Sequence, residues 1–280
     1  MKKITRRSFL AAAGLTAAAL ALTACGGSSS STASSVASSA AASSEAASSS
    51  AAAAELATVE AGKLTMATNA AFPPYEMTTD AGEFEGIDID TAKAIAEKLG
   101  LELQIDDMDF DAALLSVQQG KADIVMAGVT VTDERKAVMD FSDSYATGIQ
   151  SIIVPEGSDI TSPDDLAGKK IGTQRGTTGY IYCSDDFGDD AVVAYDDGLT
   201  AVQALNNGQV DAVVIDNAPA KEFVAANPGL VILDTSYAEE DYAIGLAKGS
   251  ALEDAVNAAL EELKADGTLQ SIVDKYITAE

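Results

Sequence analysis

Two side chains of opposite charge stand just beyond apolar runs that have the character of buried strands. Arg135 follows residues 124–126 and a turn at Gly128, and Asp216 ends the run at residues 212–215. A guanidinium can hold a carboxylate through two parallel hydrogen bonds, and a carboxylate can pair with an ammonium. Because an unpaired buried charge is costly, the two side chains together predict a cleft that binds a free amino acid.

Each of these charged residues also has an ordinary structural interpretation. Thr132 fits a helix N-cap, so Arg135 could be a surface arginine at the start of a short helix. Asp216 stands just before Ala218 and Pro219, so it could cap the next helix, and it could also do both jobs.

The neighbouring residues could complete the cleft. The Gly128 carbonyl and the Thr130 hydroxyl can accept protons of the ammonium. Backbone N–H groups near Thr130 and at Thr178 can donate to the carboxylate, and Thr178 stands where a helix N-terminus favours anions. The turn at 176–179 contains Thr177, but the chain has no Gly-x-x-x-x-Gly-Lys-Ser/Thr phosphate-loop pattern there.

The elements that must position these residues alternate between strands and helices, which indicates parallel βαβ units. One helix is predicted to begin at Asp88 or Asp90 and to end at Gly100. Residues 118–125 and 206–213 repeat a helix end, a glycine, an Asp and an apolar strand, which predicts two related lobes with Gly128 and Asp216 at equivalent strand ends. We expect strands at residues 63–68, 101–105, 122–126, 148–154, 169–173, 192–195, 212–215 and 230–233, and closing helices at 252–263 and 269–277.

Composition excludes several classes of function. The 280-residue chain has a formal net charge of −27, which disfavours nucleic acid and an unaided approach to an anionic membrane. It contains no histidine, so histidine-based catalysis and the usual zinc sites are excluded, and neither a cofactor nor a metal is expected. Its two cysteines are Cys25 and Cys183, and lipidation of Cys25 would leave no partner for a disulfide.

The N-terminal part has the composition of a targeting segment and a tether. Residues 1–25 combine basic residues, an apolar run and Leu-Thr-Ala-Cys, which resembles a bacterial lipobox with a lipid on Cys25. Residues 5–10 also resemble a twin-arginine export signal, so the Sec and Tat routes both stay open. Residues 26–58 are almost entirely Ser, Ala, Gly and Thr, which predicts a disordered linker.

Several motifs together resemble the polar amino-acid-binding proteins of ABC importers, solute-binding protein family 3, in their lipoprotein form. The matching segments, in the family's order, are residues 67–75 (ATNAAFPPY), 85–90 (EGIDID), 108–111 (MDFD), 127–135 (AGVTVTDER), 140–142 (DFS), 176–178 (GTT), 211–216 (DAVVID) and 266–268 (DGT).

The resemblance implies an α/β, periplasmic-binding-protein-like fold of type II. Two lobes, each a mainly parallel sheet flanked by helices, would enclose the ligand cleft, with residues 59–149 and 242–280 in lobe 1 and 150–241 in lobe 2. Phe72 and Phe110 would flank the ligand side chain, although both could equally be core residues. Asn69 and Gln174 would face its variable group, and both are neutral amides, so charge selection stays open.

The resemblance also implies a lipid-anchored, extracytoplasmic monomer that closes on a polar or basic L-amino acid and presents it to a membrane permease. No catalysis is expected. The alternatives are an enzyme on the same fold, similar to cyclohexadienyl dehydratases, and an amino-acid sensor. Two details stay open: Tyr75 is expected to pack against its loop, and Arg175 could point to solvent or into the cleft.

Overall fold

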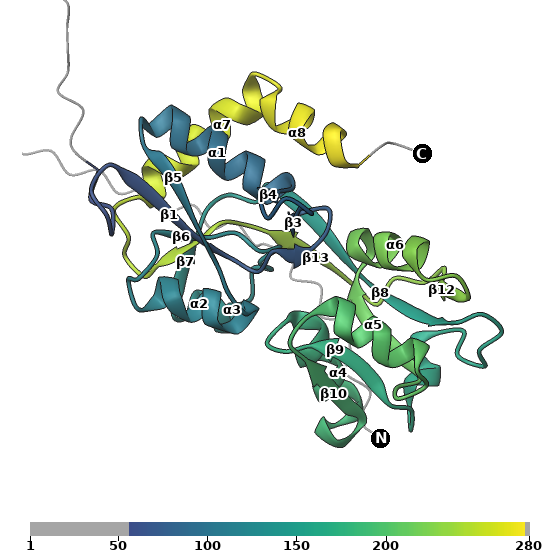
Figure 1. Cartoon of the computed structure of the whole chain (residues 1–280). Helices are drawn as coiled ribbons and strands as arrows, with labels where there is room; N and C mark the ends of the chain where they lie inside the picture. The colour runs from purple at the N-terminus through teal and green to yellow at the C-terminus, as the bar shows by residue number, and fades with distance from the viewer. Residues whose placement is uncertain (1–55, 278–280) are drawn as a thin grey trace, which may run out of the picture. The chain divides into compact units, whose positions relative to one another are not determined.

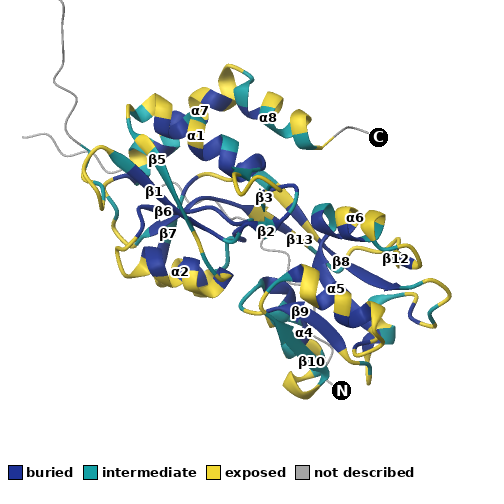
Figure 2. Ribbon diagram, viewed as in Figure 1, coloured by how far each residue is buried: buried dark blue, intermediate teal, exposed yellow. Residues whose placement is uncertain are grey.

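The computed structural model describes residues 56–277, whose strands form two larger sheets and one small sheet (Figure 1). The predicted signal peptide, the lipid on Cys25 and nearly all of the predicted linker lie outside the described residues. Buried residues follow the strands of the larger sheets, whereas exposed residues mark the outward sides of the helices (Figure 2).

The first sheet has the strand order β5-β1-β6-β14-β7. Strand β1 (Lys63–Thr68) pairs in parallel with β5 (Glu102–Asp107) and β6 (Ile124–Val125). Strand β14 (Gly245–Ala247) runs antiparallel to both β6 and β7 (Met139–Phe141).

Because side chains alternate along each strand, both faces of this sheet carry apolar side chains, and helices cover both faces. Leu64 and Met66 share a core with α1 (Ile87–Leu99) and α7 (Glu253–Ala265), while Ala67 packs with α2 (Phe110–Gln118). Helix α8 (Thr268–Tyr276) follows α7 and lies on the same side (Figure 1).

The second sheet has the order β10-β9-β11-β8-β12, with β13 also paired to β8. Strands β9 (Ile171–Gln174), β10 (Val192–Tyr195) and β11 (Ala212–Asp216) are parallel. Strand β8 (Ala146–Pro155) is antiparallel to β11, β12 (Leu230–Ile232) and β13 (Ala238–Tyr242). Its helices are α4 (Thr178–Phe187), α5 (Gly198–Asn206) and α6 (Asn217–Ala226), with short 3₁₀ turns at Pro163–Leu166 and Asp189–Ala191.

The predicted alternation of strands and helices is present, but the sheets are mixed rather than mainly parallel. In each sheet three neighbouring strands pair in parallel, and every other pairing is antiparallel. The chain leaves the first sheet along β8 and returns to it along β13, and these two strands pair antiparallel. This antiparallel pair therefore connects the two larger sheets in both chain directions.

The paired strands β8 and β13 form a ribbon with two distinct faces. Because side chains alternate, Gln150 lies on one face of β8 while Thr147 and Ile149 lie on the other. Gln150 lines a pocket together with Tyr242 of β13. Thr147 and Ile149 line a separate groove whose far wall includes α6 and Tyr276.

Helix α1 begins differently from the prediction. Its N-cap is Gly86, so the expectation that Asp88 or Asp90 caps it is wrong. The N–H groups of Ile87 and Asp88 donate to the carbonyls of Pro74 and Tyr75, at 3.0 and 2.8 Å. These backbone acceptors satisfy the free donors of the first turn, so no side-chain cap is needed there. The predicted end at Gly100 is confirmed, since Gly100 adopts the left-handed conformation with φ 70°.

A small antiparallel sheet places two side chains of the first lobe together. It consists of β2 (Ala71–Phe72), β3 (Glu76–Thr78) and β4 (Phe84–Glu85). In its register Phe72 lies opposite Glu76, so their side chains share one face.

Candidate functional site

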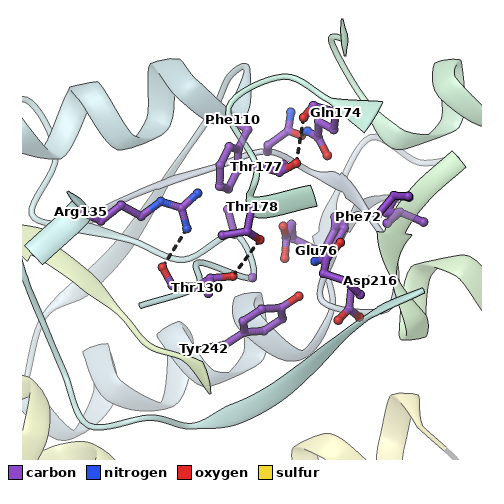
Figure 3. A pocket seen from close by; sticks show the side chains of 16 residues that line it. Phe72, Glu76, Phe110, Thr130, Arg135, Gln174, Thr177, Thr178, Asp216 and Tyr242 are labelled. Atoms are coloured by element: carbon purple, nitrogen blue, oxygen red, sulfur yellow. Dashed lines mark hydrogen bonds between the residues drawn. The ribbon is translucent and has the colours of Figure 1, made fainter. Parts of the chain in front are cut away.

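A single pocket takes in all ten residues predicted to bind ligand. They come from both larger sheets and the loops beyond them, and they are Asn69, Phe72, Phe110, Gly128, Thr130, Arg135, Gln174, Thr177, Thr178 and Asp216. The sequence analysis missed six further lining residues, which are Glu76, Ala127, Gln150, Val214, Ile215 and Tyr242. Figure 3 shows Arg135, Glu76 and Asp216 among the side chains of this one pocket.

Arg135 is buried rather than on the surface, with 8% of its area exposed. It belongs to α3 (Asp133–Lys136), and the predicted N-cap is confirmed because the Thr132 hydroxyl accepts from the Arg135 N–H at 3.2 Å. Its guanidinium donates to the Thr130 carbonyl at 2.8 Å and to the Gly176 carbonyl at 3.1 Å. Since a guanidinium has five N–H donors, three are left over from these contacts within residues 56–277.

An aromatic ring lies against the Arg135 guanidinium, and the charge of a buried carboxylate acts on it. It lies 5.4 Å from the centroid of the Phe110 ring. Burial lowers the pKa of Arg135, and the charge of Glu240 acts in the opposite direction. Glu240 is itself buried, and it accepts from the Thr130 hydroxyl at 3.1 Å and from the Gln150 amide at 3.0 Å. The arginine therefore keeps its charge and its direction within the pocket wall.

Asp216 caps a helix and also lines the pocket. One carboxylate oxygen accepts from Ala218 N at 3.0 Å, which makes it the N-cap of α6, and the other accepts from Ile149 N at 2.7 Å. The side chain is buried, and it lines the pocket beside Tyr242 (Figure 3). Burial raises the pKa of Asp216 to about 6, while hydrogen bonds from Ala218, Tyr242 and Ile149 oppose the rise.

Direct hydrogen bonds join the two lobes across the pocket. The Thr130 and Thr178 hydroxyls are 3.4 Å apart (Figure 3), and the Gln174 amide donates to the Asn69 side-chain oxygen at 2.8 Å. The bond from Arg135 to Gly176 also crosses, because α3 follows the first sheet and Gly176 follows β9. These contacts bring residues more than 40 positions apart to one site.

Gly128 is required by the close approach of an aromatic ring. It has φ 55°, and a Cβ there would lie 2.9 Å from Cε1 of Phe72. The internal repeat predicted Gly128 and Asp216 at equivalent strand ends, and both residues line the same pocket. Thr177 accepts from Tyr180 N and so caps α4.

The two phenylalanines both line the pocket and pack in the core. Phe110 lies beneath the Arg135 guanidinium, and Phe72 stacks on Tyr75 with ring centroids 5.9 Å apart. Tyr75 packs as expected and lies against Tyr242 as well, with centroids 5.4 Å apart. Arg175 points away from the pocket, since its side chain is half exposed and lies 3.4 Å from Asp196.

Glu76 is the most informative residue that the sequence analysis missed. Its side chain is fully buried, and neither carboxylate oxygen has a hydrogen-bond donor among the described residues. Burial, followed by the charge of Asp88, raises its pKa well above the usual value. The sequence analysis predicted no strand at residues 76–78; an antiparallel pairing across the Pro73-Pro74 turn would have placed Glu76 opposite Phe72.

Within residues 56–277, no helix has both the length and the apolar character that crossing a membrane requires.

The fold and the site together define a class of protein. Two α/β lobes are linked by a strand ribbon, and the pocket between them is lined by one cation, Arg135, and two carboxyls, Glu76 and Asp216. This arrangement defines a two-lobe binding protein for a small polar ligand. Residues 64–279 match the family model of the bacterial extracellular solute-binding proteins, family 3. The chain belongs to this family.

Individual relatives agree with this assignment. The L-cystine-binding protein TcyJ of Escherichia coli (strain K12) is 33% identical over 226 residues, covering 79% of this chain and 85% of TcyJ. The arginine-binding extracellular protein ArtP of Bacillus subtilis (strain 168) is 33% identical over 230 residues, covering 78% and 87%. A solved structure of an ancestral arginine-binding protein bound to glutamine has a TM-score of 0.75 and 42% identity, and the match covers 79% of this chain and 100% of that one.

These likenesses confirm the predicted family and the predicted two-lobe fold. They make the chain an extracytoplasmic amino-acid-binding protein of the ABC-transporter type. The relatives are named for binding rather than for catalysis. Their names cover amino acids with quite different side chains, so the side chain that this pocket selects must be inferred from its own residues.

Proposed function

We propose that this protein captures a basic L-amino acid, with arginine as the best representative, and delivers it to an ABC permease. The observation that carries this proposal is Glu76. A buried carboxylate without a hydrogen-bond donor is costly unless a cation pairs with it. A guanidinium or ammonium at the end of a ligand side chain would supply that cation and its donors.

The backbone part of the ligand would bind at the other charged groups. The unused N–H groups of Arg135 would hold the α-carboxylate, supported by the backbone at Thr178, at the N-terminus of α4. Asp216 would pair with the α-ammonium, and the Gly128 carbonyl and the Thr130 hydroxyl would accept its remaining protons.

The aliphatic and polar parts of the ligand side chain would lie between aromatic and amide groups. Phe72 and Phe110 offer faces that suit both methylene groups and a guanidinium. Asn69 and Gln174 bond to each other across the pocket, so a ligand that reaches them would exchange bonds with both lobes. Asn69 also donates to the Met108 carbonyl at 2.9 Å, which holds one amide in place for this exchange.

Ligand capture would proceed by closure of a hinge. The hydrogen bonds that cross the pocket join Thr130 to Thr178 and Arg135 to Gly176, so contacts from both lobes are complete only when the lobes are together. A ligand that bridges the same groups stabilises the closed arrangement by the difference in its affinity for the two states. The permease would then receive the closed form.

We infer that the protein works at the outer face of the cell membrane. A diacylglyceryl group on Cys25 would anchor the chain, and the Ser/Ala-rich segment of residues 26–58 would let the lobes reach the permease. The proposed working unit is a monomer without a cofactor. Cys183 is a poor nucleophile for an enzyme on this fold, because burial raises the pKa of its thiol to about 12.

The decisive experiment is calorimetric titration of the purified chain with arginine, ornithine, citrulline, glutamine and cystine. Citrulline has nearly the shape of arginine but carries no side-chain charge, so this pair isolates the role of Glu76. Arginine should bind at least about tenfold more tightly than citrulline at pH 8, which corresponds to about 1.4 kcal/mol. Equal or tighter binding of citrulline or glutamine would move the proposal to a neutral amide ligand.

A further inference from the structure

Two buried carboxyl groups lie against each other beside the pocket. Glu76 of β3 and Asp88 of the first turn of α1 both have 0% exposed area. The Asp88 N–H donates at 2.8 Å to the carbonyl of Tyr75, the residue before Glu76, and the charge of Asp88 acts on the Glu76 carboxyl. Oδ2 of Asp88 accepts from Gly128 N at 3.0 Å and from the Tyr145 hydroxyl at 2.8 Å. Oδ1 of Asp88 and both oxygens of Glu76 have no donor within residues 56–277.

The groups that face this pair do not supply a positive charge. Asp107, at the end of β5, adds a further negative charge near Glu76. The other titratable neighbours are the phenols of Tyr75 and Tyr145, which are neutral at ordinary pH. No lysine or arginine among the described residues forms an ion pair with either carboxyl.

Two adjacent buried carboxylates cannot both stay ionised without a cation, so the pair holds a proton. The two donors on Asp88 stabilise its ionised form, which assigns the proton to Glu76. The pKa values agree with this division, because burial raises the pKa of Asp88 to about 6 and that of Glu76 well above its usual value. The pair then carries a single negative charge.

We propose that Glu76 and Asp88 form a proton-exchange site, in which the cationic end of a bound amino acid replaces the proton that the two carboxyls share. This inference rests on the proposed function, since it assumes a ligand with a positive side chain. The O–H bond on Glu76 breaks, the proton leaves to solvent, and the carboxylate then accepts N–H groups of the ligand. Asp88 acts as a positioning residue that sets the charge of Glu76.

The exchange gives arginine binding a defined pH dependence. Protons compete with the cation, so affinity is highest at high pH and falls as pH decreases through the pKa of Glu76 in the free protein. Where one proton leaves per ligand, the dissociation constant rises about tenfold for each pH unit lost. A neutral ligand such as citrulline does not compete, because protonated Glu76 can donate to its side-chain carbonyl. Lower pH therefore shifts the preference of the pocket from arginine toward citrulline.

Titration calorimetry of the full chain tests this directly. Arginine and citrulline are each titrated at pH 7 in buffers of different ionisation enthalpy, and the slope of the observed heat gives the protons released. Both ligands share the α-amino group and the contact with Asp216, so protons released there cancel in the difference. We expect arginine to release about one proton more than citrulline. The ratio of their dissociation constants should then change by about 10- to 100-fold between pH 6 and pH 8.

Variants separate the exchange from a structural role of the pair. Glu76→Gln should remove the difference in proton release between the two ligands. Asp88→Asn keeps an acceptor for Gly128 and Tyr145 but removes the like charge, so the loss of arginine affinity should shift to lower pH. Glu83→Gln, on the exposed turn before β4, is the matched control and should change neither quantity.

The outcomes keep the two proposals distinct. If arginine binds tightly but releases no more protons than citrulline, the exchange is refuted while the proposed function stands. If arginine does not bind at all, the proposed function fails and the exchange fails with it. A difference of about one proton that disappears in Glu76→Gln establishes the exchange, and this readout does not depend on whether Asp88→Asn folds.

Discussion

Replacing Arg135 by Met is the most direct test of how this pocket binds a zwitterion. The side chain lies 8% exposed, and two of its N–H groups are used by the Thr130 and Gly176 carbonyls. Methionine fills much of the same space but leaves the ligand carboxylate buried without a partner. Removing one member of a buried ion pair costs about 3–5 kcal/mol. The dissociation constant for arginine should therefore rise roughly 10²- to 10³·⁵-fold.

Arg135→Lys gives an intermediate result if the geometry of the guanidinium matters. Lysine keeps the charge but cannot make two parallel hydrogen bonds, so about one charge-assisted bond is lost, worth about 1.5–3 kcal/mol. Calorimetry with arginine should show a loss of roughly 10- to 100-fold for this variant. Thermal melting without ligand verifies that both variants fold.

Agmatine, which is arginine without its carboxylate, provides the refuting measurement. Arg135→Met should bind agmatine at least as well as the unchanged protein does, because no carboxylate is left unpaired and one positive charge is gone. Ligand-observed NMR can read the weak affinity expected for agmatine. Equal losses for arginine and agmatine would show that Arg135 supports the fold of the pocket and does not hold a carboxylate.

Three further perturbations address other parts of the molecule. Asp216→Asn should weaken arginine far more than 5-guanidinopentanoate, which lacks the α-amino group; equal losses in calorimetry would reduce Asp216 to a helix cap. Gly128→Ala should lower the free energy of unfolding by about 1–3 kcal/mol in urea titrations, because φ 55° and the Phe72 ring both oppose a Cβ; an unchanged midpoint would contradict this. Cys25→Ser should move the protein from the membrane fraction to the soluble fraction, and unchanged detergent partitioning would refute lipidation.

Local patterns predicted those parts of the fold that local chemistry determines. The strand at residues 192–195 has the predicted bounds, and Thr132 and Asp216 cap the helices that follow them. The strand predicted at residues 122–126 is shorter in the structure, where β6 covers only Ile124–Val125. The Asp123 carboxylate accepts from the N–H groups of Val59 and Thr65, both at 2.7 Å, so a side chain ties the start of this run to β1 and to the segment before it.

The residues that sequence reasoning missed are those whose roles depend on packing between distant segments. An Asp in the first turn of a helix usually indicates a cap, but Asp88 is drawn inward by Gly128 and Tyr145, which are 40 and 57 positions away. Glu76 reaches the pocket only through its register with Phe72 in a three-stranded sheet. Neither direction follows from propensity or periodicity, because both depend on which segments meet in the folded chain.

The ribbon of β8 and β13 is a shared wall between two cavities, the amino-acid pocket and the groove beside α6. Gln150 faces the amino-acid pocket, whereas Thr147 and Ile149 face the groove between α6 and Tyr276 on the reverse side. A sheet that bends toward one side must bend away from the other, so under the proposed hinge closure the groove widens as the lobes come together. Side chains that fill the groove would thus act as a wedge. Under this hinge closure, substitutions in the groove would change the affinity for an amino acid although the substituted residues do not contact it.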